Sequence, residues 1–171
     1  MRFPNDWLDA LTIRMGRAAI LFAQIEYLLK LYAKQFLGGF DRGMIVTSRM
    51  QFNQLLDITS ALVEREIANP DLKQRFLALL PGIQKVQEKR NRYFHAAWGV
   101  GADGGPMTIG FTRAGSSGKK GNGGLVKKMV AVNAADLDEL IQSLESIKAT
   151  LTDLRPRIWP SLGKRRRKAT F

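Results

Sequence analysis

The chain contains no cysteine and only one histidine among its 171 residues. Disulfide bonds and thiolate metal sites are therefore impossible. The common metal centres that need several histidines cannot form within one chain either. We expect a protein that uses neither a metal ion nor another cofactor.

Long apolar runs are also missing. The longest uninterrupted aliphatic and aromatic run, Ala18 to Ala23, is far shorter than the roughly 20 residues that a bilayer-spanning helix requires. The first ten residues lack the apolar core of a secretory signal. These absences favour a cytoplasmic protein with no membrane segment.

Acidic residues are few compared with basic ones. The chain has 27 Lys and Arg against 15 Asp and Glu, which gives a net charge of +12 and a pI near 10.4. Such a field attracts polyanions, so nucleic acid is the first partner to expect and an anionic membrane surface the second. The 45% hydrophobic content is that of a globular protein, and the length fits one domain.

Apolar residues recur at steps of three and four through most of the chain, which predicts amphipathic helices. The first helix is expected to begin at Asn5 or Asp6 and to end at Gly38–Gly39. Pro81 should kink or divide the third helical region. The four helical regions predicted in this way are residues 5–37, 48–68, 71–98 and a last helix that follows a cap at Asn133.

Residues 99–124 have a different composition. Gly and Ser dominate, and a helix is disfavoured there. The segments 107–113 and 125–132 are rich in β-formers and predict a hairpin. The loop between them carries Lys119 and Lys120.

The expected fold is mainly α, a four- to five-helix bundle with a β-hairpin insertion before the last helix. One domain should cover residues 1–160, with the insertion at about 99–132, followed by a basic tail at 161–171.

One arginine interrupts the apolar stripe of the third helical region. Steps of three and four after Val86 reach positions 90, 93 and 97, and the first of these is Arg90. A guanidinium in a burial stripe is unfavourable unless an anion or a partner compensates it. Arg90 therefore has either a structural partner, with Glu26 and Glu88 as the candidates, or a functional role.

A polar stripe runs beside this arginine. Asn91 and His95 are four residues apart, so they share a helix face that the long side chain of Arg90 can reach. Arginine offers a forked donor to phosphate oxygens, and a near-neutral imidazole can move protons. The asparagine amide can orient a hydroxyl. These three residues form a reasonable set for handling a phosphodiester.

The segment "RNRYFH", Arg90 to His95, resembles the motif of the HEPN superfamily, in which an arginine, a polar residue and three variable residues precede a histidine. The flanking "HAAWG" and the segment "LFAQIEYLLK", with its single acidic Glu26, are similar to parts of some members. The resemblance covers about residues 5–98 and the last helix, but not the Gly-rich insertion.

The resemblance implies a small helical bundle and a metal-independent RNase of the kind found in toxin–antitoxin and phage-defence systems. It also implies a homodimer in which two copies of the motif form one cleft, and a possible cognate antitoxin. His95 would move the proton of an RNA 2′-hydroxyl, Arg90 would stabilise charge on the phosphorane and Asn91 would orient the groups. Glu26 would orient Arg90.

Simpler interpretations remain open for each residue. His95 can be a helix-terminal imidazole that interacts favourably with the helix dipole. Tyr93, a possible supporting residue, is expected to pack or to lie at a dimer interface, as is Trp98, with base stacking as a lesser alternative.

The remaining candidate residues are basic. They can capture RNA through its phosphates or simply keep a segment solvated. They are Lys119, Lys120, Lys164, Arg165, Arg166, Arg167 and Lys168.

The leading hypothesis is thus an endoribonuclease that cleaves RNA through attack by the 2′-hydroxyl. The main alternative is a catalytically inactive helical module that binds nucleic acid or a partner protein.

Overall fold

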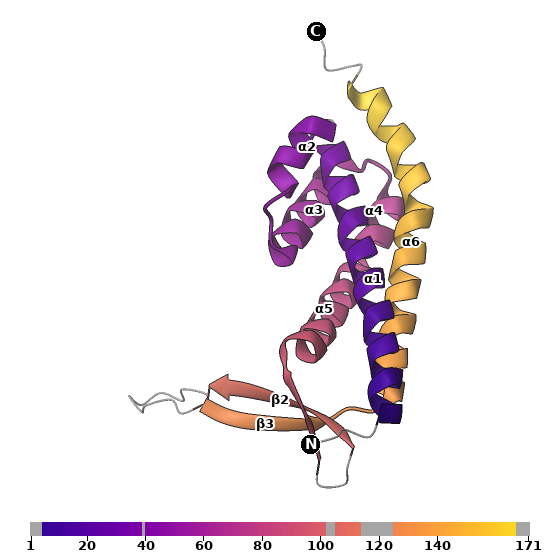
Figure 1. Cartoon of the computed structure of the whole chain (residues 1–171). Helices are drawn as coiled ribbons and strands as arrows, with labels where there is room; N and C mark the ends of the chain where they lie inside the picture. Colours follow the sequence, from indigo (N-terminus) through magenta and orange to yellow (C-terminus); the bar gives the residue numbers. More distant parts are fainter. Residues whose placement is uncertain (1–4, 39, 102–104, 114–124, 167–171) are drawn as a thin grey trace.

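The computed structural model describes residues 5–38, 40–101, 105–113 and 125–166 of the chain. These residues form six helices and one small sheet (Figure 1). The helices are α1 Asn5–Phe36, α2 Phe40–Thr47, α3 Phe52–Glu66, α4 Pro70–Leu77, α5 Leu80–His95 and α6 Ala134–Arg166. The predicted mainly helical fold with a β insertion before the last helix is confirmed.

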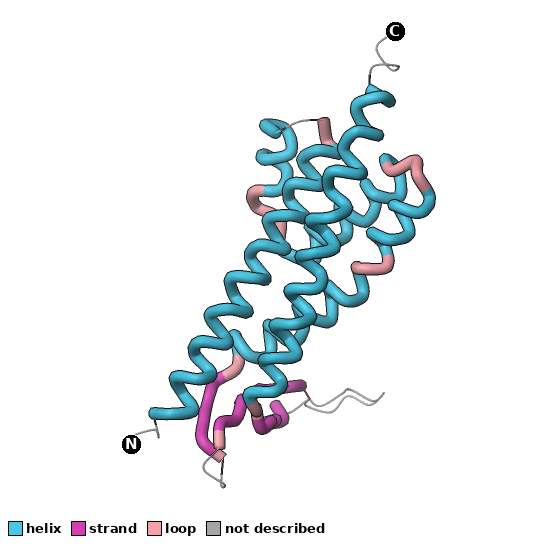
Figure 2. Tube along the Cα trace, turned by 90° about the vertical axis from the view of Figure 1, so that its right-hand side faces the viewer, coloured by secondary structure: helices cyan, strands magenta, loops and turns pink. Residues whose placement is uncertain are grey.

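The two long helices, α1 and α6, lie side by side and run in the same direction along the whole bundle (Figures 1 and 2). Their apolar faces meet because leucine, isoleucine and aromatic side chains recur at helical spacing on both. The Tyr32 hydroxyl on α1 donates a 2.6 Å hydrogen bond to the Leu151 carbonyl oxygen on α6. Arg14 pairs with Asp138 near the start of both helices, which fixes the same parallel register.

A glycine pair separates α1 from α2. Gly38 adopts a left-handed backbone with φ of 103°, a conformation that glycine reaches without steric cost. The chain then turns back, and α2 packs closely on α1. A Cβ on Gly43 would overlap the Lys34 Cα and side chain, so only glycine permits this approach.

Helix α4 begins with a clear cap. Asn69 accepts hydrogen bonds from the backbone N–H groups of Asp71 and Leu72 at 2.9 and 3.1 Å, and Pro70 occupies the first helical turn. The expected break near Pro81 is present, since α4 ends at Leu77 and α5 starts at Leu80.

The sheet lies across the end of the bundle at which α1 and α6 begin (Figures 1 and 2). It has the antiparallel order β1-β2-β3, formed by Ala97–Val100, Pro106–Arg113 and Leu125–Ala131. The predicted hairpin is β2 and β3. Strand β1 was not predicted, and the expectation that the third helical region reaches Trp98 is wrong, because α5 ends at His95 and residues 97–100 pair with β2 instead. Its presence places the sheet directly after α5.

The helices differ from the sequence prediction in further places. Helix α2 is additional, and α3 begins at Phe52 because Gln51 and Gln54 form a capping box there, four residues after the expected start. Helix α6 continues to Arg166, so residues 161–166 of the expected tail extend the last helix.

Within the described part of the chain, no helix combines the length and the apolar character that crossing a membrane would require. The same residues contain no group of three or more His, Asp or Glu side chains that could hold a metal ion.

Candidate active site

The residues of the motif come together at the C-terminal end of α5, close to the sheet. The Arg90 Nη1 donates to the Asn91 Oδ1 at 3.0 Å and lies 3.1 Å from the His95 Nε2. The side chains of Asn91 and His95 are exposed, whereas Arg90 is half-buried. One guanidinium nitrogen therefore links all three side chains at the protein surface.

Two phenylalanine rings hold the Arg90 guanidinium in place. Its central carbon lies 5.3 Å from the centre of the Phe22 ring on α1 and 5.2 Å from that of Phe94 on α5. Both distances are typical of cation–π contacts, which favour arginine in an otherwise apolar setting. The Arg90 Nε is buried and has no hydrogen-bond partner. Aromatic faces thus compensate the charge, and part of the hydrogen-bonding capacity of Arg90 stays unused.

The Arg90–His95 contact is compatible with one tautomer of the His95 ring. A guanidinium nitrogen can only donate, so the His95 Nε2 must be the acceptor. The tautomer that offers this acceptor carries its proton on Nδ1. A neutral imidazole is the form that a general base requires.

Glu26 does not orient Arg90. Its carboxylate accepts a 2.6 Å bond from the Lys30 Nζ, one turn further along α1. A glutamate four residues before a lysine is a favourable helix pair, and this local partner takes the carboxylate. The expectation that Glu26 supports the site by contacting Arg90 is therefore wrong. Glu88, the other candidate, forms no ion pair with Arg90 either.

Tyr93 lies outside this cluster. It is two residues from both Asn91 and His95, which turns it about 200° around the helix from each. The side chain is buried, and burial raises the pKa of its hydroxyl, with a further increase from the Asp136 carboxylate on α6. Tyr93 packs α5 against α6 and has no direct part in the site.

Trp98 connects the site to the sheet. Its Nε1 donates a 2.9 Å hydrogen bond to the Tyr93 carbonyl oxygen. This bond ties β1 to the last turn of α5 and so supports the backbone that carries His95. Packing, one of the expected roles of Trp98, is the one that this geometry favours.

The described residues place none of the basic candidates beside the Arg90 cluster. Lys119, Lys120, Arg167 and Lys168 lie outside the described residues. Lys164, Arg165 and Arg166 form the last turn of α6, at the opposite end of the bundle from the sheet (Figure 1). The described part of the basic C-terminal segment therefore does not lie beside the Arg90 cluster.

A groove of 430 Å³ lies between α5 and α6, beside the cluster but on another face of α5. Lys85 and Lys89 line one wall, and Lys89 pairs with Glu139 at 2.9 Å. The hydrogen bond from Lys89 lowers the pKa of the Glu139 carboxyl, with added help from the charge of the lysine. This ion pair partly neutralises the groove, and none of Arg90, Asn91 and His95 lines it.

Two residues that shape the site were missed in the sequence. Phe94 is four residues after Arg90, and this spacing on a helix could have indicated the contact. Phe22 belongs to a segment 68 positions earlier, and its sequence context shows only that it is part of a core stripe.

Comparison of the chain with protein-family models, with curated proteins and with solved structures gives no match.

Proposed function

We propose that this chain is a metal-independent endoribonuclease of HEPN type that acts as a toxin or phage-defence effector. One observation carries the proposal: Arg90, Asn91 and His95 meet at an exposed helix end through a guanidinium that no described carboxylate neutralises. A phosphate group would supply the missing negative charge.

The reaction follows from the two functional groups. The His95 Nε2 takes the proton of an RNA 2′-hydroxyl, and the 2′-oxygen then forms a bond to the adjacent phosphorus. The bond from phosphorus to the 5′-oxygen breaks, and that oxygen receives a proton from solvent or from a second imidazole. The products are a 2′,3′-cyclic phosphate and a 5′-hydroxyl.

Substrate binding would have to rearrange one hydrogen bond. The His95 Nε2 accepts from Arg90 in the free protein, so it must be released before it can take a proton. Phosphate oxygens are stronger acceptors for a guanidinium than a neutral imidazole is. Arg90 would therefore turn toward the phosphate and free His95 at the moment when the 2′-hydroxyl arrives. Asn91, whose oxygen also accepts from Arg90, would help to hold the guanidinium in position.

A homodimer fits this chemistry, because one chain supplies a single histidine and a dimer supplies a base and an acid. The dimer and a cognate antitoxin protein are part of the proposal. Sedimentation of the protein as a monomer alone at high micromolar concentration would contradict the dimer.

The second candidate function is a catalytically inactive helical module that binds nucleic acid or a protein partner. The observation in its favour is the same Arg90–His95 bond, since it would also serve as a structural link at the end of α5. In that case His95 stabilises the helix end and never moves a proton.

The deciding experiment measures cleavage of a single-stranded RNA, and of DNA with the same sequence, in EDTA. We expect the wild type to cut only the RNA, since DNA lacks the 2′-hydroxyl. His95→Ala should slow cleavage by about a hundredfold or more, the usual effect of losing a positioned acid–base group. Gln84→Ala is the matched control, because Gln84 is exposed on the polar stripe of the same helix. Equal cleavage by His95→Ala and the wild type would favour the binding module.

A further inference from the structure

A second polar pocket lies far from the Arg90 cluster, between the C-terminal halves of α1 and α6. It encloses 380 Å³. We call it the Trp159 pocket, and its lining residues are Tyr27, Leu31, Lys34, Gln35, Arg155 and Trp159.

Arg155 and Trp159 form the wall on α6. They are four residues apart and share a helix face, and the central carbon of the guanidinium lies 3.8 Å from the centre of the indole ring. The Arg155 Nε and the Trp159 Nε1 are both buried without a hydrogen-bond partner. Two neighbouring N–H donors on residues that line this pocket thus lack an acceptor, which is unfavourable unless the side chains shift and a ligand provides one.

The rest of the lining has the same bias toward donors. No carboxylate is among the described residues that line the pocket. Lys34 has only 5% of its surface exposed and brings a second positive charge, although its side chain also has an interaction of its own. The ligand that complements this wall is an anion with several acceptor oxygens, as a phosphate group is.

Aromatic surface lies beside these donors. Tyr27 lines the pocket and is 56% exposed, and the Arg155 guanidinium lies over the Trp159 ring. Planar bases stack on aromatic rings and on arginine guanidinium planes. A ligand that combines a phosphate with a planar ring would use both features.

We propose that the Trp159 pocket binds a nucleotide. Its phosphate accepts from Arg155 and from the Trp159 N–H, and its base stacks against Tyr27 or the Arg155 plane. The nucleotide is either a free mononucleotide or the phosphorylated end of a strand, since both present the same chemistry.

The pocket is separate from the proposed catalytic residues. Phe22, which contacts Arg90, precedes Lys34 by 12 residues, and this corresponds to about 18 Å along α1. Nucleotide binding at this pocket therefore does not depend on the proposed ribonuclease activity, and its test requires no cleavage.

The test is calorimetric titration of the full chain with five probes: adenosine 5′-monophosphate, adenosine, inorganic phosphate, and a five-nucleotide single-stranded DNA with and without a 5′-phosphate. We expect the monophosphate to bind at least about tenfold more tightly than adenosine or phosphate alone, because only it engages both surfaces. Tighter binding of the 5′-phosphorylated DNA than of the monophosphate would identify a strand end as the source. Tighter binding of the monophosphate would identify the free nucleotide.

Three variants locate the binding. Arg155→Gln should weaken binding at least about tenfold, and Trp159→Phe, which keeps a ring but removes the N–H, should weaken it several-fold. Arg157→Gln is the matched control, because it removes the same charge from α6 while Arg157 pairs with Asp153 on another face. Circular dichroism checks that each variant is folded.

Several results would overturn the proposal. These are no binding of either phosphorylated probe, equal affinity for inorganic phosphate and the monophosphate, or an equal weakening of binding in Arg155→Gln and Arg157→Gln. If Arg155→Gln does not fold, an unchanged affinity in Trp159→Phe has the same consequence.

Discussion

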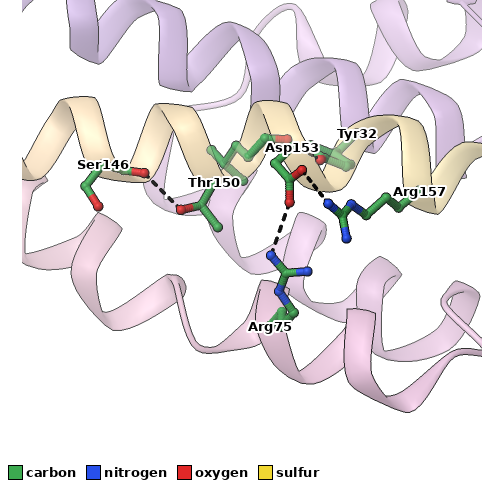
Figure 3. Close-up of polar contacts among 7 residues, drawn as sticks. Tyr32, Arg75, Ser146, Thr150, Asp153 and Arg157 are labelled. Atoms are coloured by element: carbon green, nitrogen blue, oxygen red, sulfur yellow. Dashed lines mark hydrogen bonds and ion pairs between the residues drawn. The ribbon is translucent and has the colours of Figure 1, made fainter.

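The molecule holds arginine in two very different settings. On α6, Asp153 lies between Arg75 of α4 and Arg157, with ion pairs of 3.1 and 2.8 Å (Figure 3). At the end of α5, Arg90 is held between two phenylalanine rings and reaches an amide and an imidazole. The first setting pairs its arginines with a carboxylate of the chain, and the second does not.

The difference indicates which arginine is available for an outside anion. Desolvation works against the charged form of Asp153, but hydrogen bonds and charge from Arg157 and Arg75 outweigh it and lower its pKa. Both arginines are thereby engaged in the fold. Arg90 is positioned by aromatic contacts, and no described carboxylate pairs with its charge. Such an arginine suits transition-state stabilisation, because it costs little reorganisation when charge develops.

The largest effect should come from removing Arg90, with the removal of Arg157 as the comparison. We expect Arg90→Gln to slow RNA cleavage by about a hundredfold or more while lowering the free energy of unfolding by only about 1 kcal/mol. Arg157→Gln should leave cleavage unchanged. Single-turnover cleavage assays and urea unfolding measure the two quantities. Similar reductions of activity in both variants would show that charge, and not position, matters.

A smaller effect should follow from replacing Lys164, Arg165, Arg166, Arg167 and Lys168 with glutamine. These cations can hold RNA through its phosphates without taking part in the chemistry, so we expect weaker binding with the cleavage step intact. The slope of log affinity against log salt should decrease by about 0.7 for each RNA phosphate that the variant no longer neutralises. An unchanged slope in filter-binding assays would mean that this segment does not touch RNA.

The aromatic support of Arg90 should appear as a coupling energy. In a double-mutant cycle on stability, Phe94→Leu and Arg90→Met should couple by about 0.5–2 kcal/mol, the range for a cation–π contact. The same cycle with Arg92→Met should give no coupling, because Arg92 is exposed on another face. A zero value for the Arg90 pair would show that the rings do not hold the guanidinium.

The smallest effect concerns the ion pairs of Asp153 and depends on pH. The pKa of Asp153 is lowered in the folded state, so its contribution to stability is present above its ordinary value of 3.8. That contribution is lost as the pH falls through the lower folded-state pKa. Asp153→Asn should thus be less stable than the wild type at pH 7, and the difference should vanish in strong acid. Urea midpoints from pH 7 to pH 2 measure this, and a constant difference would contradict it.

Local patterns in the sequence predicted most of the secondary structure. The three-four spacing predicted α1 to within one residue of its end, and the β-rich segments predicted β2 and β3. Helix α2 was missed because it is eight residues long and depends on packing against α1 through Gly43, which no local signal reveals.

The same distinction between local and distant contacts applies to the candidate site. The contacts of Arg90 with Asn91 and His95 join residues at most five positions apart on one helix, so their spacing was enough to predict them. The predicted role of Glu26 was wrong because a lysine on its own helix lies closer than any distant arginine.

The sequence by itself determined the periodicity of the helices, the excess of positive charge and the meeting of three polar side chains at the end of α5. Only the tertiary structure decided that Phe22 covers Arg90 and that Arg155 and Trp159 face a pocket beside α1. Neighbours along a helix are fixed by its 3.6-residue repeat. Contacts between helices depend instead on how whole apolar faces pack, and this is a property of many residues acting together.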